Sequence, residues 1–261
     1  MVTSRSDPAV WLRSVRASHD RLTATVEGLD PSDLGRPSLC GQWSIAQVLS
    51  HLGSQAEIFS LLVDAGMDGT DPPSQEAFAP IWDAWNSRSA RDQATDSITA
   101  NGALVSRLER LDSEALGTFH LEAFGMDLDA AGLLRLRLSE HALHTWDVAA
   151  ALDPAARVAP DAVELLLEGL PELAARVGKP TPHSSTVAIT TTDPRRRFFL
   201  APEGVRLEPT NEPTGTAIAG SISLTAETLV RLVYGRLQET DAVHVERGIS
   251  LEELRAVFPG F

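Results

Sequence analysis

The sequence contains only one cysteine, Cys40, and only one lysine, Lys179, among its 261 residues. A single cysteine excludes a disulfide within the chain, which agrees with a reducing compartment. No run approaches the ~20 consecutive apolar residues that span a bilayer, and the N-terminus lacks the charged-then-apolar pattern of a signal peptide. These absences predict a soluble cytoplasmic protein with no membrane partner.

Positive charge is also scarce. The chain has 22 Lys and Arg residues against 36 Asp and Glu residues, which gives a formal net charge of -14 at pH 7. Such an acidic surface repels phosphate backbones and argues against nucleic acid as a partner. With 43% hydrophobic residues, a chain of this length can bury one large core or two modest ones, and we expect two domains.

The stretch 133–152 is rich in Leu and Ala, contains no Gly or Pro, and stops at Asp153-Pro154. It therefore predicts one helix with a defined end. Glu140 and His144 are four residues apart, so they lie one above the other on one face, where both can bind one divalent cation. His141 is rotated by about 100° from Glu140 and cannot easily join them.

Two ligands make an incomplete site, because a catalytic zinc usually takes three protein ligands and keeps one position open. We expect the third ligand to be His51, on a helix that starts at Ser44, where Ser44 and Gln47 form a capping box. Ordinary alternatives exist for these residues. A Glu–His pair at this spacing is common on solvated faces, and a His among apolar neighbours is often a hydrogen-bonded core residue.

Two motifs carry a resemblance to a known family. The first is Cys-Gly-Gln-Trp-Ser at 40–44 leading to His51, and the second is Arg-Leu-Arg-Leu-Ser-Glu at 135–140 leading to His-Thr-Trp-Asp at 144–147. In order and separation they resemble the signatures of the mycothiol-dependent maleylpyruvate isomerase family, which belongs to the DinB-like metal-binding four-helix bundles. The resemblance covers most of the chain and implies that His51, Glu140 and His144 bind one divalent metal, zinc by default.

The resemblance also implies mycothiol as a thiol cosubstrate. A metal-bound thiol loses its proton near neutral pH, and the thiolate can isomerise an activated double bond or form an S-conjugate. We therefore expect a metal- and mycothiol-dependent isomerase or thiol S-transferase that acts on a small electrophilic metabolite. Two other classes stay open: a metal-stabilised module that binds a small molecule, and a metal-dependent hydrolase that uses bound water. The preference for Arg over Lys agrees with a GC-rich actinobacterial genome.

The expected fold class is α+β in two domains. Residues 1–155 are expected to form a DinB-like four-helix bundle, with helices after Asp7-Pro8 and Ser44, a bent or broken helical region over 75–111, and the helix 133–152. A small hairpin or extended loop, not a helix, is expected over 116–125. Residues 156–261 resemble the smaller C-terminal domain of the family, with an antiparallel sheet of strands near 185–192, 197–201, 205–207, 216–222 and 243–246.

Three helices are expected in the C-terminal domain. The first covers 160–177 and is kinked or split by Pro171, the second covers 224–237 after a cap at Ser223, and the third follows a capping box of Ser250 and Glu253. By resemblance, Arg236 occupies the family's aromatic-Gly-Arg position. This makes it a candidate for binding a carboxylate of the substrate or cosubstrate and for facing the metal cleft, unless it only satisfies the end of its helix.

Asp147 is the remaining candidate for a role in the chemistry. Its carboxylate can accept the imidazole N–H of His144 and fix the tautomer of that ring, or it can serve a local hydrogen bond. The other chemistry-bearing residues have ordinary interpretations. Cys40 is a small apolar residue before its helix, His19 is a packing residue, His120 is a solvated loop residue, and Trp82, Trp85 and Phe119 belong to the core or to a pocket wall.

Overall fold

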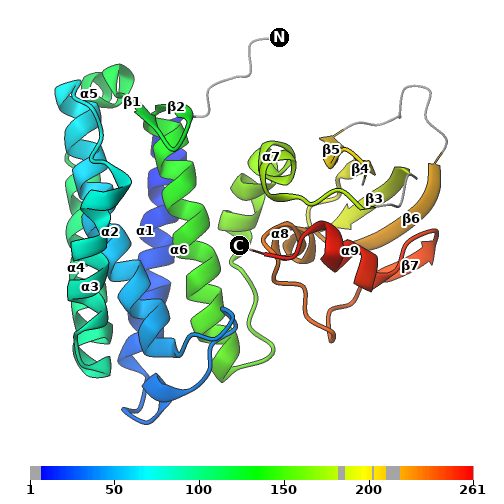
Figure 1. Cartoon of the computed structure of the whole chain (residues 1–261), viewed down its shortest axis with the longest axis horizontal. Coiled ribbons are helices and arrows are strands. Elements are labelled where there is room, and N and C mark those ends of the chain that lie inside the picture. Colours follow the sequence, from blue (N-terminus) through cyan, green and yellow to red (C-terminus); the bar gives the residue numbers. More distant parts are fainter. Residues whose placement is uncertain (1–6, 182–185, 202, 210–217, 261) are drawn as a thin grey trace. The chain divides into compact units, whose positions relative to one another are not determined.

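The computed structural model describes residues 7–181, 186–201, 203–209 and 218–260 (Figure 1). The chain divides into two compact units, Met1–Ala162 and Val163–Phe261, and helix α7 (Pro160–Val177) crosses this division. The expected domain boundary at residues 155 and 156 stays a prediction. In the described part of the chain, no helix is long and apolar enough to span a membrane.

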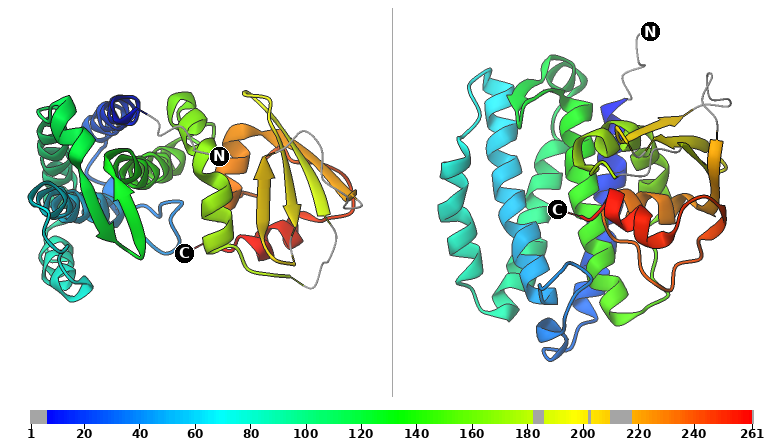
Figure 2. Two further views of the ribbon diagram at one scale, coloured as in Figure 1. Left: turned by 90° about the horizontal axis from the view of Figure 1, so that it is seen from above. Right: turned by 45° about the vertical axis from the view of Figure 1, so that its right-hand side comes forward.

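The first unit is helical. It contains α1 (Pro8–Glu27), α2 (Ile45–Asp68), α3 (Ala79–Asn86), α4 (Ala90–Leu108), α5 (Ser113–Thr118) and α6 (Ala130–Leu152), with 3-10 turns η1 (Asp33–Gly35) and η2 (Gln75–Phe78). The four long helices α1, α2, α4 and α6 pack against one another, and Figure 2 shows them nearly end-on in its left view. The expected four-helix bundle is confirmed.

The helix ends follow the capping signals in the sequence. Asp7 accepts a hydrogen bond from the backbone N–H of Ala9 at the start of α1, and Ser44 and Gln47 form the predicted capping box of α2. The helical region over 75–111 is broken as expected. The break falls at residues 87–89, where Ser89 caps α4, and the glycine at 102 is accommodated inside that helix.

A small hairpin precedes α6, as predicted. Strands β1 (His120–Ala123) and β2 (Met126–Asp129) pair antiparallel around a two-residue turn, Phe124-Gly125. The prediction that no helix forms over 116–125 is wrong at its start, because 116–118 lie in the short helix α5. Asp112 caps α5 by accepting from the N–H of Ala115, a local signal that offsets the low helix propensity of Gly117.

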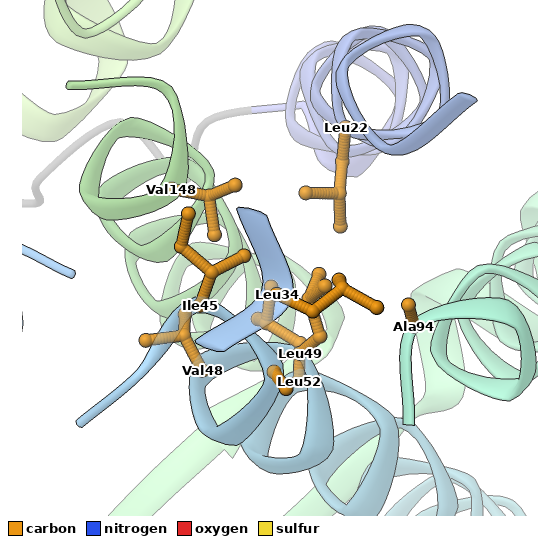
Figure 3. Packing of buried hydrophobic residues seen from close by; sticks show 9 residues of the cluster. Leu22, Leu34, Ile45, Val48, Leu49, Leu52, Ala94 and Val148 are labelled. Carbon is orange, nitrogen blue, oxygen red and sulfur yellow. The ribbon is translucent and has the colours of Figure 1, made fainter. Parts of the chain in front are cut away.

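A cluster of buried aliphatic residues fixes the start of α2. Its members come from α1, η1, α2, α4 and α6, and their side chains point toward one another in Figure 3: Leu22, Leu34, Ile45, Val48, Leu49, Leu52, Ala94 and Val148. Full burial of each Leu, Ile or Val contributes about 1.5–3 kcal/mol. These contacts hold the first two turns of α2 in place. They therefore also fix the direction in which His51 projects from that helix.

Close packing of α2 against α3 gives a first testable prediction. A Cβ atom added at Gly53 of α2 would overlap the ring of Trp85, which is 1% exposed. We expect Gly53→Ala to destabilise the protein by about 1–2 kcal/mol, because the overlap outweighs the better helix propensity of alanine. Urea unfolding measures this change. Gly117→Ala is the control, since nothing lies within 4 Å of its added Cβ, and an equal loss there would contradict the packing argument.

In its described residues, the second unit contains a five-stranded sheet, most of α7 and two further helices. Its strands are β3 (Thr186–Thr192), β4 (Arg197–Ala201), β5 (Arg206–Pro209), β6 (Ile218–Thr225) and β7 (His244–Arg247), in the order β5-β4-β3-β6-β7. The helices are α7, α8 (Ala226–Val233) and α9 (Leu251–Val257), the last with the predicted capping box. Ser185 and Thr216, where two strands were expected to begin, lie outside the described residues.

Two expectations for this unit need correction, one on the sheet and one on the start of α8. The sheet is mixed, because β3 and β6 pair in parallel while the other neighbours are antiparallel. Strand alternation indicates a strand but does not give its direction relative to a distant neighbour. Helix α8 starts later than expected, after Thr225 and not Ser223, because residues 223–225 still pair with β3. Of the two outcomes expected at Pro171, a kink or a split, the split is excluded, because α7 continues through this residue.

Candidate metal centre

Three of the predicted site residues converge within the helical unit. Oε2 of Glu140 lies 3.3 Å from Nε2 of His51 and 3.6 Å from Nε2 of His144. The three possible ligand atoms all lie within 4.8 Å of one another. Tetrahedral ligands at the usual zinc distances are separated by about 3.4 Å, so the donor atoms and their spacing fit one divalent cation.

The helices explain this convergence. Glu140 and His144 are stacked one turn apart on α6, while His51 reaches them from the second turn of α2. His141 lies on another face, as the helical rotation predicts: it is fully buried, and its Nδ1 is 2.9 Å from the hydroxyl of Ser18 on α1. The ring of His19 meets His141 edge-on, which agrees with its interpretation as a packing residue.

Asp147 lies behind His144. Its carboxylate Oδ2 is 2.9 Å from Nδ1 of His144, and the Asp147 side chain is fully buried. A proton on Nδ1 that is donated to this carboxylate leaves the lone pair on Nε2 directed to the side of Glu140. The arrangement is suited to holding His144 as a metal ligand.

The surroundings of Glu140 keep its carboxylate ionised. Desolvation opposes ionisation of Glu140, but hydrogen bonds to His144 and His51 outweigh it and hold the pKa of the Glu140 carboxyl well below its usual range.

The two histidines are shifted in opposite directions. Burial also opposes charge on His144, yet hydrogen bonds with Asp147, Cys40 and Glu140 raise the pKa of its imidazole to about 10. Burial lowers the pKa of His51, with partial compensation by Glu140, so His51 is held in its neutral, ligating form.

Sequence reasoning missed two polar residues that support Glu140. The amide nitrogen of Gln55 donates to Oε2 of Glu140 at 2.7 Å, and the amide oxygen of Gln55 accepts from Arg137 at 3.0 Å. Arg137 is 1% exposed and also donates to the side-chain oxygen of Asn101. Burial lowers the pKa of Arg137 to about 10, with partial compensation by Glu140. Two signals were available in the sequence: Gln55 lies one turn after His51, and Arg137 lies in the motif at 135–140 that leads to Glu140.

Cys40 is closer to the site than its interpretation as a small apolar residue implies. Its thiol, His144 and Asp147 form a second group of possible ligands that shares His144 with the first. Exposure distinguishes the two groups: the side chains of His51 and Glu140 are 23% and 36% exposed, whereas Asp147 is completely buried. A catalytic metal needs an open coordination position, which favours the group of His51, Glu140 and His144.

A pocket of about 540 Å³ lies beside His51. Its apolar lining residues come from the segment before α2, from α2, η2 and α3, and from the hairpin: Trp43, Ile58, Phe59, Phe78, Trp82 and Phe124. Its polar lining residues are mostly amides: Gln47, His51, Ser54, Gln55, Asn86 and Gln93. The ring of Trp43 lies 5.1 Å from that of His51 and 6.4 Å from that of His144, centroid to centroid, so the pocket adjoins the cluster.

The remaining predicted residues are distributed differently. Trp82 lines the pocket, but Trp85 and Phe119 are buried in the core, where Phe119 packs on the glycine at 66. His120 lies in β1, where Nδ1 of its exposed side chain is 3.1 Å from the carboxylate of Asp127. Arg236 belongs to the second unit, where it donates to the carbonyl of Tyr234 after α8. The role of Arg236 at the metal cleft stays a prediction.

The contact between Asp147 and His144 gives a second testable prediction. Asp147→Asn is expected to weaken metal binding by about 10–100-fold, because an amide can donate to Nδ1 and place the proton on Nε2. Competition with a chromophoric chelator measures the affinity. Asp127→Asn is the matched control, since it alters the exposed His120–Asp127 pair; an equal loss in both variants would refute the orienting role.

The fold and the cluster together define a class of protein: a four-helix bundle in which facing helices bring three possible metal ligands together. Residues 15–149 match the family model of the mycothiol maleylpyruvate isomerase N-terminal domain. The match covers more than half of the chain, which therefore belongs to the mycothiol maleylpyruvate isomerase family. The resemblance inferred from the two motifs is confirmed.

Solved structures support the same fold over nearly the whole chain. A crystal structure of the mycothiol-dependent maleylpyruvate isomerase has a TM-score of 0.71 and 15% sequence identity, covering 95% of this chain and 98% of that chain. A histidine-to-alanine mutant of that enzyme has a TM-score of 0.70 with the same identity and coverage. No curated protein sequence has significant similarity to the chain.

Proposed function

We propose that the chain is a metal- and mycothiol-dependent enzyme that activates a thiolate for cis–trans isomerisation of, or S-transfer to, a small electrophilic metabolite. The observation that carries this proposal is the convergence of His51, Glu140 and His144 beside a pocket, in a chain of this family. A divalent cation held there would stabilise a bound thiolate over the thiol near neutral pH. Zinc is the default, although nickel and iron tolerate the same ligands.

The side chains of the cluster have distinct roles in this proposal. His144, whose pKa is raised to about 10, would release a proton when a metal binds. Two neutral imidazoles and one carboxylate would then leave a divalent ion with a single positive charge, which favours an anionic sulfur ligand. Asp147 orients His144, and Gln55 holds the Glu140 carboxylate through the amide contact at 2.7 Å. Arg236 is proposed to bind a carboxylate of the substrate or cosubstrate. A thiol cosubstrate implies a reducing compartment, so we propose a cytoplasmic location.

Two other functions remain as outcomes of the test. A metal site with an open position lowers the pKa of bound water to about 7 and can support hydrolysis. A bundle can also keep its ligands and serve only to bind a small molecule. The partly exposed Glu140 and His51 side chains favour an accessible reaction site but do not choose among these chemistries.

The test is product analysis with and without thiol. Metal-replete protein is incubated with mycothiol and a panel of electrophiles that includes maleylpyruvate, and the products are identified by mass spectrometry. We expect an isomer or an S-conjugate that forms only when mycothiol is present. Turnover that persists unchanged without any thiol would support the hydrolase, and no turnover across the panel would support the binding module.

A further inference from the structure

Exposed aromatic side chains gather around the pocket beside His51. Large hydrophobic side chains that are at least 36% exposed in the described part of the chain are Trp43, Leu61, Met67, Trp82 and Phe124. The three aromatic members of this set all line the pocket. Exposed aromatic faces that gather around one cavity favour a ligand that covers them.

Apart from the cation proposed at His51, the same pocket offers a ligand no charge. None of its described lining residues is Asp, Glu, Lys or Arg. Several of its polar groups already bond to the protein backbone: the amide oxygen of Gln47 accepts from the N–H of Ser44, while Ser54 and Gln93 donate to backbone carbonyls. A small dianion placed here would lose its hydration without meeting a cation from these residues.

Phe124 adds an independent observation. It occupies the first position of the two-residue turn between β1 and β2, with φ 56°, and Gly125 follows with φ 71°. Positive φ at both positions is the pattern of a type I′ turn, in which Asn-Gly is strongly preferred. A phenylalanine in this conformation is strained, and the residue is 57% exposed at the pocket. Strained residues cluster at ligand sites.

We propose that this pocket binds the uncharged aromatic or conjugated body of the electrophilic substrate, with its reactive bond toward His51. This inference rests on the proposed function and deepens it by naming a substrate class. The substrate is an electrophile with an apolar body, rather than a compact dicarboxylate. Trp82 and Phe124 determine this specificity through ring contacts with the ligand. The rings of Trp82 and Phe78 pack edge-on, 6.1 Å between centroids, so two adjacent aromatic side chains form this part of the pocket wall.

Binding of unreactive probes tests the proposal without any thiol chemistry. Isothermal titration calorimetry on the metal-replete full chain compares benzylacetone, a neutral aryl ketone, with succinate, a dianion, and myo-inositol, a polyol. We expect benzylacetone to bind at least about 10-fold more tightly than either other probe. We also expect Trp82→Ala to weaken benzylacetone binding by about 5–20-fold, while Leu61→Ala, which alters an exposed residue outside the pocket, leaves it unchanged.

Phe124→Asn separates ligand binding from folding. Asparagine suits the turn, so this variant is expected to raise the midpoint of thermal unfolding while it weakens benzylacetone binding by about 5-fold or more. Unchanged benzylacetone binding in both Trp82→Ala and Phe124→Asn would overturn the proposal. Preferred binding of succinate or of myo-inositol that is lost in Trp82→Ala would overturn it as well.

The outcomes also distinguish this inference from the proposed function. If benzylacetone binds as expected and no electrophile reacts with mycothiol, the pocket assignment stands and the proposed chemistry fails. If mycothiol reacts with a compact dicarboxylate and benzylacetone does not bind, the chemistry stands and the pocket assignment fails.

Discussion

His144→Ala is expected to abolish stoichiometric binding of a divalent metal and, with it, thiol-dependent turnover. His144 supplies Nε2 at 3.6 Å from Oε2 of Glu140, and its other ring nitrogen is held by Asp147. Removal of an outer partner such as Asp147 typically costs 10–100-fold in affinity, so loss of a direct ligand is expected to cost more than about 100-fold. The measurement is metal content by mass spectrometry on protein purified without a polyhistidine tag.

The same experiment tests each proposed ligand against a matched control. His51→Ala and Glu140→Gln should also lose the metal, because each removes one of the three converging donors. His120→Ala should retain it, since His120 is paired with Asp127 in the hairpin. Full metal content in His51→Ala and His144→Ala would show that the assignment is wrong, and loss restricted to variants of Cys40, His144 and Asp147 would move the metal to that second group.

The ligand cluster could be anticipated because helix geometry is local. The spacing of Glu140 and His144 fixes their shared face once 133–152 is helical, and the capping box at Ser44 fixes the phase of His51. What local geometry could not supply was the distance between α2 and α6. The family resemblance provided that step, and the structure brings the three donors to within 4.8 Å of one another.

The surroundings of the cluster depend on contacts between distant segments, which periodicity does not encode. In the sequence, Arg137 is one more polar residue on its helix, yet its guanidinium is buried and donates to Gln55 and Asn101 on two other helices. The parallel pairing of β3 with β6 is a similar case, because the direction of a strand depends on the connection that returns the chain to the sheet. In both cases the structure depends on a contact with a segment that is far away in sequence.

Trp82 and Trp85 are only three residues apart, and the sequence pattern does not predict their surroundings either. Both belong to α3, and their spacing alone does not assign one to the core and the other to the pocket. The structure leaves Trp82 37% exposed and Trp85 1% exposed. The difference arises from α2, where Gly53 leaves room for the Trp85 ring and Glu57 accepts its indole N–H at 2.8 Å.

Trp85→Ala is therefore expected to destabilise the protein by about 3–5 kcal/mol, whereas Trp82→Ala should cost less than about 1 kcal/mol. Truncation of Trp85 leaves a cavity against Gly53 and removes the ring on which the Arg88 guanidinium lies, 3.7 Å from the centroid. Trp82 is the matched control, with the same side chain on the same helix. Urea unfolding at equal metal loading measures both free energies, and metal removal with a chelator repeats the comparison without any contribution from the metal.

The pair also predicts opposite functional outcomes. Trp82→Ala should keep its stability and lose benzylacetone affinity, because its ring lines the pocket. Trp85→Ala lowers the midpoint of unfolding, and its effect on the pocket should be indirect, through α3, which carries both tryptophans. Equal destabilisation by the two substitutions would mean that α3 does not pack on α2 as described, and the pocket wall assigned to Trp82 would then fail with it.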